Sequence, residues 1–360
     1  MPVASATVPT DADDAPPPPL HGVRELPGVT VESYSLPVLD HADGSFFGDR
    51  ASRRAFGWML DAWRGVFADI AGKDALGVRP TADIPKDRLD ALLAANGPAA
   101  ATIRAACEDY ALQLVAVVRR FQRQKSWKQV ERVVIGGGFQ ESAVGEHAIG
   151  RAAELLAEAR AGVSLRTLHH HADEGGLIGW LHIAPPEVLQ DHDGLLAVDI
   201  GGTNVRCGIV RVRGHGPDLT RAEVLAHDKW THADDEDVQR RHHVVEGIAD
   251  MLERTIREAR GDGVTLAPYV GIGCPGTVEP DGTLSAGAQN LPGNWESSRF
   301  HLPRELCALL PKIAGRTTQV RLHNDAVVQG LSELPYMRDV KRWGVLTVGT
   351  GLGNASFTNR

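Results

Sequence analysis

The residues best suited to chemistry follow apolar stretches that end in glycine. The first set runs from Asp199 through Gly201 and Gly202 to Thr203 and Asn204. Glycines let the backbone approach phosphate oxygens with its N–H groups turned toward them, and the threonine and asparagine add side-chain donors. Asp199, expected at the end of a buried strand, is placed to hold a hydrated Mg²⁺ ion. An ordinary hairpin turn has the same composition, so this segment alone leaves both interpretations open.

A second turn of the same form contains Gly349, Thr350 and Gly351, again after an apolar stretch and before a predicted hairpin. Two such turns favour two similar domains that face one nucleotide. Neither turn is followed by the Lys and Ser or Thr of a P-loop, and neither opens a helix as a dinucleotide-binding turn would. The two turns together therefore predict a phosphate-binding site that is neither a P-loop nor a dinucleotide-binding turn, with one turn on each side of the phosphates.

Between the two turns, Asn324 and Asp325 lie at a predicted strand end that leads into a helix. A carboxylate there can accept the proton of a substrate hydroxyl as that hydroxyl attacks a γ-phosphate. The competing interpretation is that Asp325 only caps the helix, but its position between two phosphate turns favours catalysis. Gly276, in a Gly/Pro loop, and Asn290 complete the candidate site, and the amide of Asn290 suits vicinal hydroxyls. Asparagines in such loops are also common turn formers.

The chain of 360 residues is long enough for two domains that would position these groups. Residues 1–28 contain few large apolar side chains and a run of prolines, which predicts a disordered tail. Residues 29–183 are expected to form most of one α/β domain, which residues 344–360 complete. The Pro- and Asp-containing segment 184–194 is expected to be a linker, and residues 195–340 the other α/β domain.

Apolar periodicity places the secondary structure within these domains. Spacings of three and four residues predict helices, and short apolar runs predict strands. The expected helices are 51–70, 98–123, 145–160 and 238–260; the expected strands are 29–38, 132–135, 164–169, 195–200, 269–272, 319–322 and 344–348; and a hairpin is expected over 205–226, with its turn at Gly214, Gly216 and Pro217.

Composition argues against several classes of protein. The formal net charge of −8 is unsuited to a dedicated nucleic-acid binder. The chain has no apolar run of about 18 residues that could span a bilayer, and its N-terminus lacks the pattern of a secretory signal. We therefore expect no membrane partner and a cytoplasmic location. The four cysteines are scattered without a CxxC pair, so neither a disulfide framework nor a structural zinc site is expected.

The motifs of the second half of the chain, in their order, resemble those of the ROK family, which comprises repressors, open reading frames and sugar kinases. Residues 199–204 match its first phosphate motif, and residues 271–276 (GIGCPG) match its GxGxPG loop. Residues 290–295 (NLPGNW) are similar to its sugar-contacting NLPGW, with one residue inserted. Asn324 and Asp325 match its sugar-contacting Asn and its catalytic base. The turn at Gly349 to Gly351 matches the second phosphate motif.

This resemblance implies an α/β fold of two actin/hexokinase-like (ribonuclease H-like) domains that flank a nucleotide and sugar cleft. It implies a glucokinase-like, ATP-dependent sugar kinase that uses Mg²⁺ near Asp199 and Asp325 as general base. The acceptor would be the 6-hydroxyl of a hexose or amino sugar, which Asn290, Asn324 and Gly276 would help to bind. The expected partners are ATP and a small-molecule sugar, with a homodimer left open.

The family's second half is missing from the end of this chain, but the first half of the chain resembles it. Gly136, Gly137 and Gly138 follow an apolar strand and look like the family's glycine turn beside the adenosine. Residues 173–179 resemble its Gly-rich helix start near the C-terminus. We therefore expect a circular permutation, with the old termini joined through 184–194. Packing does not depend on chain order, and surface loops tolerate such cuts.

Two sequence features of the ROK family are not found in this sequence. One is the GExGH segment, whose Glu and His contact the sugar, and the other is a Cys-rich zinc motif. The equivalent stretch would lie within residues 29–50, where the candidates are Glu32, Asp40, His41 and Asp43. Two further functions stay open: a sugar-sensing regulator like the family's repressors, which carry a helix-turn-helix module, and a catalytically inactive sugar-binding protein.

Overall fold

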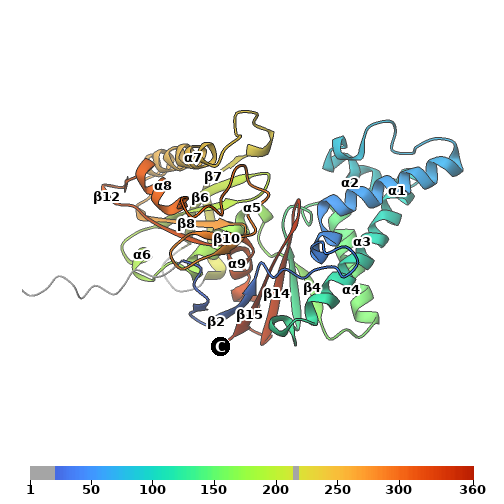
Figure 1. Cartoon of the computed structure of the whole chain (residues 1–360), viewed down its shortest axis with the longest axis horizontal. Coiled ribbons are helices and arrows are strands. Elements are labelled where there is room, and N and C mark those ends of the chain that lie inside the picture. Colours follow the sequence, from blue (N-terminus) through green and yellow to red (C-terminus); the bar gives the residue numbers. More distant parts are fainter. Residues whose placement is uncertain (1–20, 214–218) are drawn as a thin grey trace, which may run out of the picture.

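The computed structural model describes residues 21–213 and 219–360, which form two β-sheets with helices packed on them (Figure 1). One sheet has five strands in the order β13-β8-β5-β6-β7, and the other has six in the order β1-β2-β15-β14-β3-β4. The protein therefore belongs to the mixed α/β class, as its sequence predicts.

The five-stranded sheet comes from one continuous part of the chain. Strands β13, β8 and β5 are parallel, and β6 and β7 continue the sheet antiparallel. Every residue of β5 is buried, as expected for an apolar strand covered on both faces. The turn predicted between β6 and β7 at Gly214 to Pro217 lies outside the described residues. The strands are β5 (Gly194–Ile200), β6 (Val205–Val212), β7 (Ala222–Trp230), β8 (Leu266–Cys274) and β13 (Gln319–Asn324).

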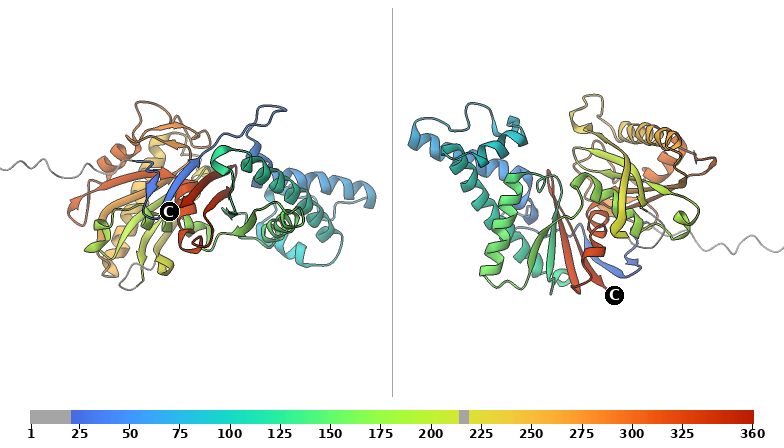
Figure 2. Two further views of the ribbon diagram at one scale, coloured as in Figure 1. Left: turned by 90° about the horizontal axis from the view of Figure 1, so that it is seen from below. Right: turned by 180° about the vertical axis from the view of Figure 1, so that it is seen from behind.

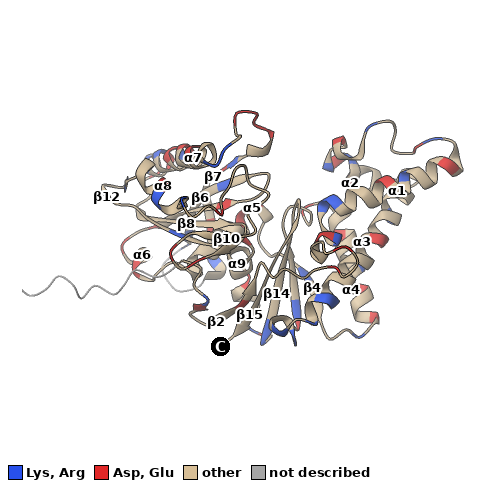
Figure 3. Ribbon diagram, in the orientation of Figure 1, with Lys and Arg blue, Asp and Glu red and all other residues tan. Residues whose placement is uncertain are grey.

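Helices α7 (Arg241–Gly261) and α8 (Leu302–Leu309) cover one face of this sheet (Figure 1). The inward face of α7 buries Val245, Ile248 and Leu252 in the core under the sheet. Charged residues of both signs appear along the same helix in Figure 3. The apolar spacing of three and four residues thus decides which face of α7 is buried.

Both ends of the chain contribute to the six-stranded sheet (Figure 2). β14 pairs with β3 in parallel, and β15, which contains Asn354, pairs antiparallel with β2. The last residues of the chain therefore have partners, and these come from its N-terminal half. The strands are β1 (Glu25–Leu26), β2 (Val29–Tyr34), β3 (Arg132–Gly136), β4 (Ser164–Thr167), β14 (Arg342–Val348) and β15 (Leu352–Asn359).

Four helices pack on the side of this sheet that faces away from the five-stranded sheet (Figures 1 and 2). They are α1 (Arg53–Ala71), α2 (Lys86–Ala94), α3 (Pro98–Gln122) and α4 (Ala143–Glu158). Helices α5 (Ala172–Ile178) and α9 (Asp325–Leu331) lie between the sheets, since α9 contacts β14 on one side and β8 on the other. α2 was not predicted from the sequence; it is short, and of its residues only Leu93 is buried.

Some segments differ from the sequence prediction. Of the tail expected over residues 1–28, residues 1–20 lie outside the described part. Residues 21–28 are ordered by pairing, because β1 joins β2 and the Gly22 N–H donates to the Leu322 carbonyl at 3.0 Å. The expected linker 184–194 contains a short helix, α6 (Glu187–Gln190). None of the described helices combines the length and the apolar character that crossing a membrane requires.

Candidate functional site

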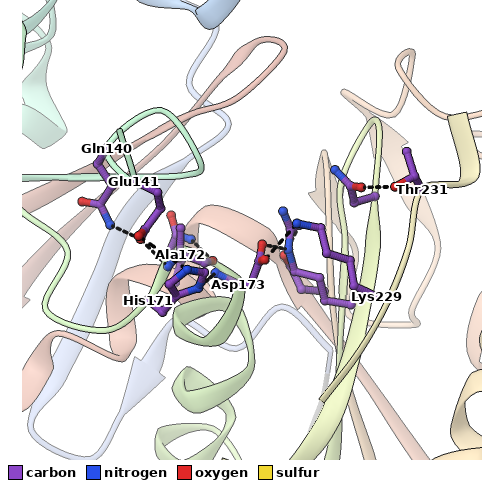
Figure 4. Close-up of polar contacts among 11 residues, drawn as sticks. Gln140, Glu141, His171, Ala172, Asp173, Lys229 and Thr231 are labelled. Carbon is purple, nitrogen blue, oxygen red and sulfur yellow. Dashed lines mark hydrogen bonds and ion pairs between the residues drawn. The ribbon is translucent and has the colours of Figure 1, made fainter. Parts of the chain in front are cut away.

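The first glycine turn follows β5 and is closed by its own residues. The Gly201 N–H donates to the Asn204 carbonyl at 2.8 Å, which makes the tight turn into β6. The Asn204 side chain accepts a hydrogen bond from the Thr231 hydroxyl at 2.9 Å (Figure 4). The buried His232 contacts the Gly201 carbonyl through Nε2 at 2.9 Å. Asn204 thus supports the turn, while the side chain of Thr203 remains available at its surface.

The second glycine turn meets the first. The hydroxyl oxygens of Thr203 and Thr350 are 3.0 Å apart, although 147 positions separate them in the sequence. Gly349 is held by the N-terminus of α1, where the Arg53 N–H donates to the Gly349 carbonyl at 3.0 Å. The structure therefore brings the two predicted phosphate turns together, one from each sheet. Backbone and hydroxyl donors from both could contact one polyanionic group.

The third glycine cluster, residues 136–138, lies beside the second turn because β3 is the parallel neighbour of β14. Gly137 has φ +82°, and a Cβ on it would come within 2.4 Å of the Val348 carbonyl oxygen. A Cβ on Gly136 would meet the side chain of Gln329, whereas one on Gly138 would meet open space. Glycine at position 137 is thus required for the close approach of this turn to the end of β14.

Asp325, directly after β13, and Asp199, in β5, lie on either side of Gly273 in β8, the strand between them. A Cβ placed on Gly273 would lie 3.5 Å from the Asp325 Cα and 3.7 Å from Asp199 Oδ1. Burial, and then the negative charge of Asp199, raise the pKa of Asp325 to about 7. Asn324, not Asp325, caps α9, because its side chain accepts from the Val327 N–H at 3.2 Å. A carboxyl group that titrates near neutrality can serve as a general base.

Asp199 also belongs to a charge network that joins α5 to the five-stranded sheet. Arg206 Nη1 lies 3.2 Å from Asp199 Oδ2, and the same guanidinium pairs with Asp173. Lys229 completes the network at 2.8 Å from Asp173 (Figure 4). Burial alone would raise the pKa of Asp173, but Lys229 and Arg206 hold it at about 2. Burial raises the pKa of Asp199, and Arg206 opposes that rise. Sequence reasoning missed this arginine, although it lies only two positions after Asn204.

The site offers Mg²⁺ few protein ligands. Among residues 21–213 and 219–360, no group of three or more His, Cys, Asp or Glu side chains is arranged to hold a metal ion. Mg²⁺ in phosphoryl-transfer sites commonly keeps several waters and uses one or two carboxylates together with substrate phosphates. Asp199, with Asp325 nearby, fits that second arrangement.

Asn324 and Gly276, two of the residues predicted to bind the sugar, belong to one polar cluster. Asn324 Nδ2 donates to the Gly276 carbonyl at 3.1 Å and to Asp325 Oδ1 at 3.0 Å. Gly276 has φ +99°, and a Cβ there would come within 2.2 Å of the Ala286 carbonyl oxygen. The cluster includes Ser35, whose hydroxyl lies 3.1 Å from Asn324 Nδ2. These bonds fix the orientation of the Asn324 amide beside the Asp325 carboxyl.

Asn290 lies between the two glycine turns. The Cβ of Asn290 is 3.1 Å from the point where a Cβ on Gly202 would lie. The Nδ2 of Asn290 is 3.8 Å from the point where a Cβ on Gly351 would lie. Asp49 Oδ1 is 3.5 Å from the same position at Gly351. The exposed Asn290 is thus free to meet a ligand that enters between the turns. Asp49 reaches the same place from the 3₁₀ turn Phe47–Ala51 before α1.

The four candidates expected to replace the missing sugar contacts are engaged elsewhere. Glu32 accepts from the Thr358 hydroxyl at 2.6 Å, Asp40 pairs with Arg50, His41 contacts Arg120, and Asp43 accepts from the Ser45 N–H at 2.9 Å. From the same stretch the structure brings Ser35 and Asp49 to the site instead. Ser35 has a left-handed backbone (φ 47°), which is uncommon for serine. Its position directly after β2 gave no sequence signal of that kind.

Comparison with known proteins gives only distant similarities. No protein-family model matches the chain, and no curated protein matches it. Among solved structures, a protein from Cytophaga hutchinsonii described as a sugar kinase is 23% identical, with a TM-score of 0.34 over 46% of this chain and 48% of that one. A Listeria monocytogenes protein described as an N-acetylmannosamine kinase is 23% identical, with a TM-score of 0.32 over 46% of this chain and 47% of that one.

An exopolyphosphatase from Cytophaga hutchinsonii is 16% identical, with a TM-score of 0.26 over 46% of this chain and 51% of that one. The chain thus spans about half the length of these three structures. With TM-scores this low, a functional proposal must rest on the geometry of the site.

Proposed function

We propose that this protein is an ATP-dependent sugar kinase that transfers the γ-phosphate to a hydroxyl of a hexose or amino sugar. The main support for this proposal is the arrangement of the two glycine turns and Asp325. The two glycine turns touch at Thr203 and Thr350, and Asp325, with its raised pKa, follows β13, which only β8 separates from β5, the strand of the first turn. Donors for a polyphosphate and a base for a hydroxyl are thus close together, as phosphoryl transfer requires.

In the proposed reaction the phosphates of ATP lie between the glycine turns and replace the contact between Thr203 and Thr350. Asp325 accepts the proton of the sugar hydroxyl, whose oxygen forms a bond to the γ-phosphorus while the bond from that phosphorus to the β,γ-bridging oxygen of ADP breaks. Asn324 holds the Asp325 carboxyl in place. By the ROK resemblance the acceptor is the 6-hydroxyl, and the adenosine lies near Gly138, where the structure leaves open space.

Mg²⁺ bound with ATP would neutralise charge on the phosphates, and Asp199 would hold it through water. The guanidinium of Arg206 supplies a fixed positive charge at the same place, since its Nη1 lies 3.8 Å from the position of a Cβ on Gly201. We propose that Arg206 keeps Asp199 ionised and oriented until the metal arrives.

We also propose that the chain order is a circular permutation of the ROK arrangement, with domains 195–340 and 29–183 plus 344–360. The pairing of β14 with β3 and of β15 with β2 supports this, because the C-terminal strands find the neighbours that the rest of such a domain would provide. Closure of the two domains would exclude water, so that the sugar hydroxyl attacks the phosphate instead.

The test is ATP consumption on a panel of hexoses and amino sugars by the wild type, Asp325→Asn and Glu333→Gln. Asp325→Asn should lower kcat by about a hundredfold or more, because the base is lost. Glu333 is the matched control, since burial raises its pKa to about 7 as well, but its carboxylate accepts from the His169 N–H at 2.8 Å, away from the turns. Glu333→Gln should keep most of the activity.

Equal activity in the wild type and Asp325→Asn would overturn the assignment of the base. No sugar-dependent ATP consumption by the wild type, together with saturable sugar binding, would favour a catalytically inactive sugar-binding protein. Sequence-specific DNA binding in a mobility-shift assay would favour the regulator.

A further inference from the structure

A cavity bordered by the described residues lies away from the two glycine turns. Its volume is about 1110 Å³, and none of the site residues described above lines it. Its walls come from residues 22–27, from the segment 181–193 that contains α6, and from strands β6, β8 and β13. In Figure 1 the blue segment with β2 and the helix α6 lie along the lower side of the five-stranded sheet. This rear cavity therefore requires an explanation separate from the kinase site.

Two buried polar groups of the rear cavity lack partners within the described part of the chain. Tyr269 is only 1% exposed, and its hydroxyl makes no hydrogen bond there. The Nε–H of Arg321 is also buried without an acceptor, while its Nη1 donates only to the Val320 carbonyl, at 3.2 Å. Buried donors normally find acceptors, because an unmade bond costs stability. Both side chains line the cavity, so an acceptor inside it could satisfy them.

The positive charge of this cavity is carried by Arg321. Arg211 and Arg213 also line it, but both pair with Glu223. Burial lowers the pKa of His182 and of His323 to about 4, so both imidazoles are neutral at neutral pH. Among the described residues Arg321 makes no ion pair. Of the acids that line the cavity, Glu25 pairs with Arg360, and Asp191 and Asp193 are exposed. An anionic group is therefore the complementary occupant for this end of the cavity.

The remainder of the wall is largely apolar. Leu181, Ile183 and Leu189 face the cavity together with Leu26 and Val212. An inorganic anion alone would leave this surface uncovered, and burial of apolar surface is favourable. We propose that the rear cavity is a binding site for a molecule with an acid group and an apolar body, its acid group held by Arg321 and Tyr269.

The site is coupled by position to the catalytic strand. His323 lines the rear cavity and donates from Nε2 to the Val23 carbonyl at 2.9 Å. Its Nδ1 accepts from the N–H of Asn324 at 2.8 Å, one residue before Asp325. A ligand that shifts Val23 or His323 would therefore act on the strand end that carries the proposed base. The binding itself does not depend on the proposed kinase activity.

The experiment uses the full-length protein and two probes with an acid group on an apolar body, anilinonaphthalene sulfonate and octanoate. Fluorescence titration with the first should show saturable binding, and octanoate should displace it. Arg321→Gln should weaken binding of both by about tenfold or more, and Tyr269→Phe by about threefold, as expected for charged and neutral hydrogen bonds. Leu189→Trp should abolish binding by filling the space.

The matched control is Arg123→Gln, which removes an exposed arginine at the end of α3, outside the cavity, and should bind as the wild type does. Circular dichroism and thermal unfolding verify that each variant is folded. Displacement of the fluorescent probe by ATP or glucose would assign it to the kinase site and overturn the proposal. Failure of both probes to bind, or unchanged binding in folded Arg321→Gln and Leu189→Trp, would mean that the cavity holds water only.

Discussion

The two glycine turns have the same form but are held in different ways. The first turn, Gly201 to Asn204, is fixed by residues close in sequence, since Asn204, Thr231 and His232 make its hydrogen bonds. The second turn, Gly349 to Gly351, has one local bond, from the Gly349 N–H to the Gly351 carbonyl at 2.9 Å, but it is also held by residues from the N-terminal half of the chain. Arg53 bonds to Gly349, and the glycine cluster 136–138 packs against the preceding strand.

This difference teaches that one motif can be formed locally or assembled across the whole chain. The first turn belongs to a sheet whose strands all lie between residues 194 and 324. The second belongs to a sheet that exists only when both chain ends have come together. We therefore expect the first turn to tolerate changes elsewhere and the second to be sensitive to distant packing.

The largest loss of stability caused by a substitution should come from Gly137→Val. Its left-handed φ and the 2.4 Å approach of the Val348 carbonyl leave no room for a branched side chain. We expect a loss of about 3 kcal/mol in the free energy of unfolding, measured by urea denaturation. Gly138→Val, where a Cβ meets open space, is the control and should cost no more than about 0.5 kcal/mol. Equal losses would show that the second turn does not depend on this packing.

A second prediction concerns Asp325, which is influenced by the strand of the first turn through Asp199. Its pKa of about 7 in the folded state lies above its ordinary value of about 4. The folded state therefore binds this proton more tightly than the unfolded chain. Stability should fall as pH rises from about 4 to about 7 and stay low above that range.

Asp325→Asn cannot ionise, so it should escape this loss. Its stability relative to that of the wild type should increase by about 4 kcal/mol between pH 4 and pH 8. Urea denaturation of both proteins across that range measures the difference. A constant difference would mean that Asp325 titrates normally. In the wild type kcat should rise with pH through about 7, because the base acts ionised.

A smaller effect is expected within the first turn itself. Asn204→Ala and Thr231→Val each remove one partner of the 2.9 Å hydrogen bond between them. Each change should cost about 1 kcal/mol, and the double variant should cost less than their sum, because only one bond is lost. Additive losses in the double-mutant cycle would show that the turn is held by other contacts.

The smallest stability effect should come from the point where the turns meet. Thr203→Val and Thr350→Val remove hydroxyls from a contact at the surface, so each should change the free energy of unfolding by less than about 0.5 kcal/mol. Each should nevertheless raise the KM for ATP severalfold in steady-state kinetics. An effect from only one of the two would indicate that the phosphates contact a single turn.

Much of the site could be predicted because its parts are local. A strand that ends in a glycine turn forms from neighbouring residues, and so does a strand that ends in Asn324 and Asp325 before a helix. Both features are at the positions that the sequence predicts. The sequence could not predict which residues of 29–50 reach the site. That depends on how β2 and the 3₁₀ turn before α1 are placed in the fold. There Ser35 and Asp49 were missed, and Glu32, Asp40, His41 and Asp43 face other partners.

The sequence by itself determined the α/β class, the strands that end in glycine turns and the carboxyl groups at two strand ends. Periodicity and backbone chemistry act over a few residues, so those features need no knowledge of the rest of the chain. Only the tertiary structure decided that the turns touch at Thr203 and Thr350, that Arg206 pairs with Asp199 and that burial brings the pKa of Asp325 near neutrality. Distance and desolvation are properties of packed side chains, and they exist only once both ends of the chain have met.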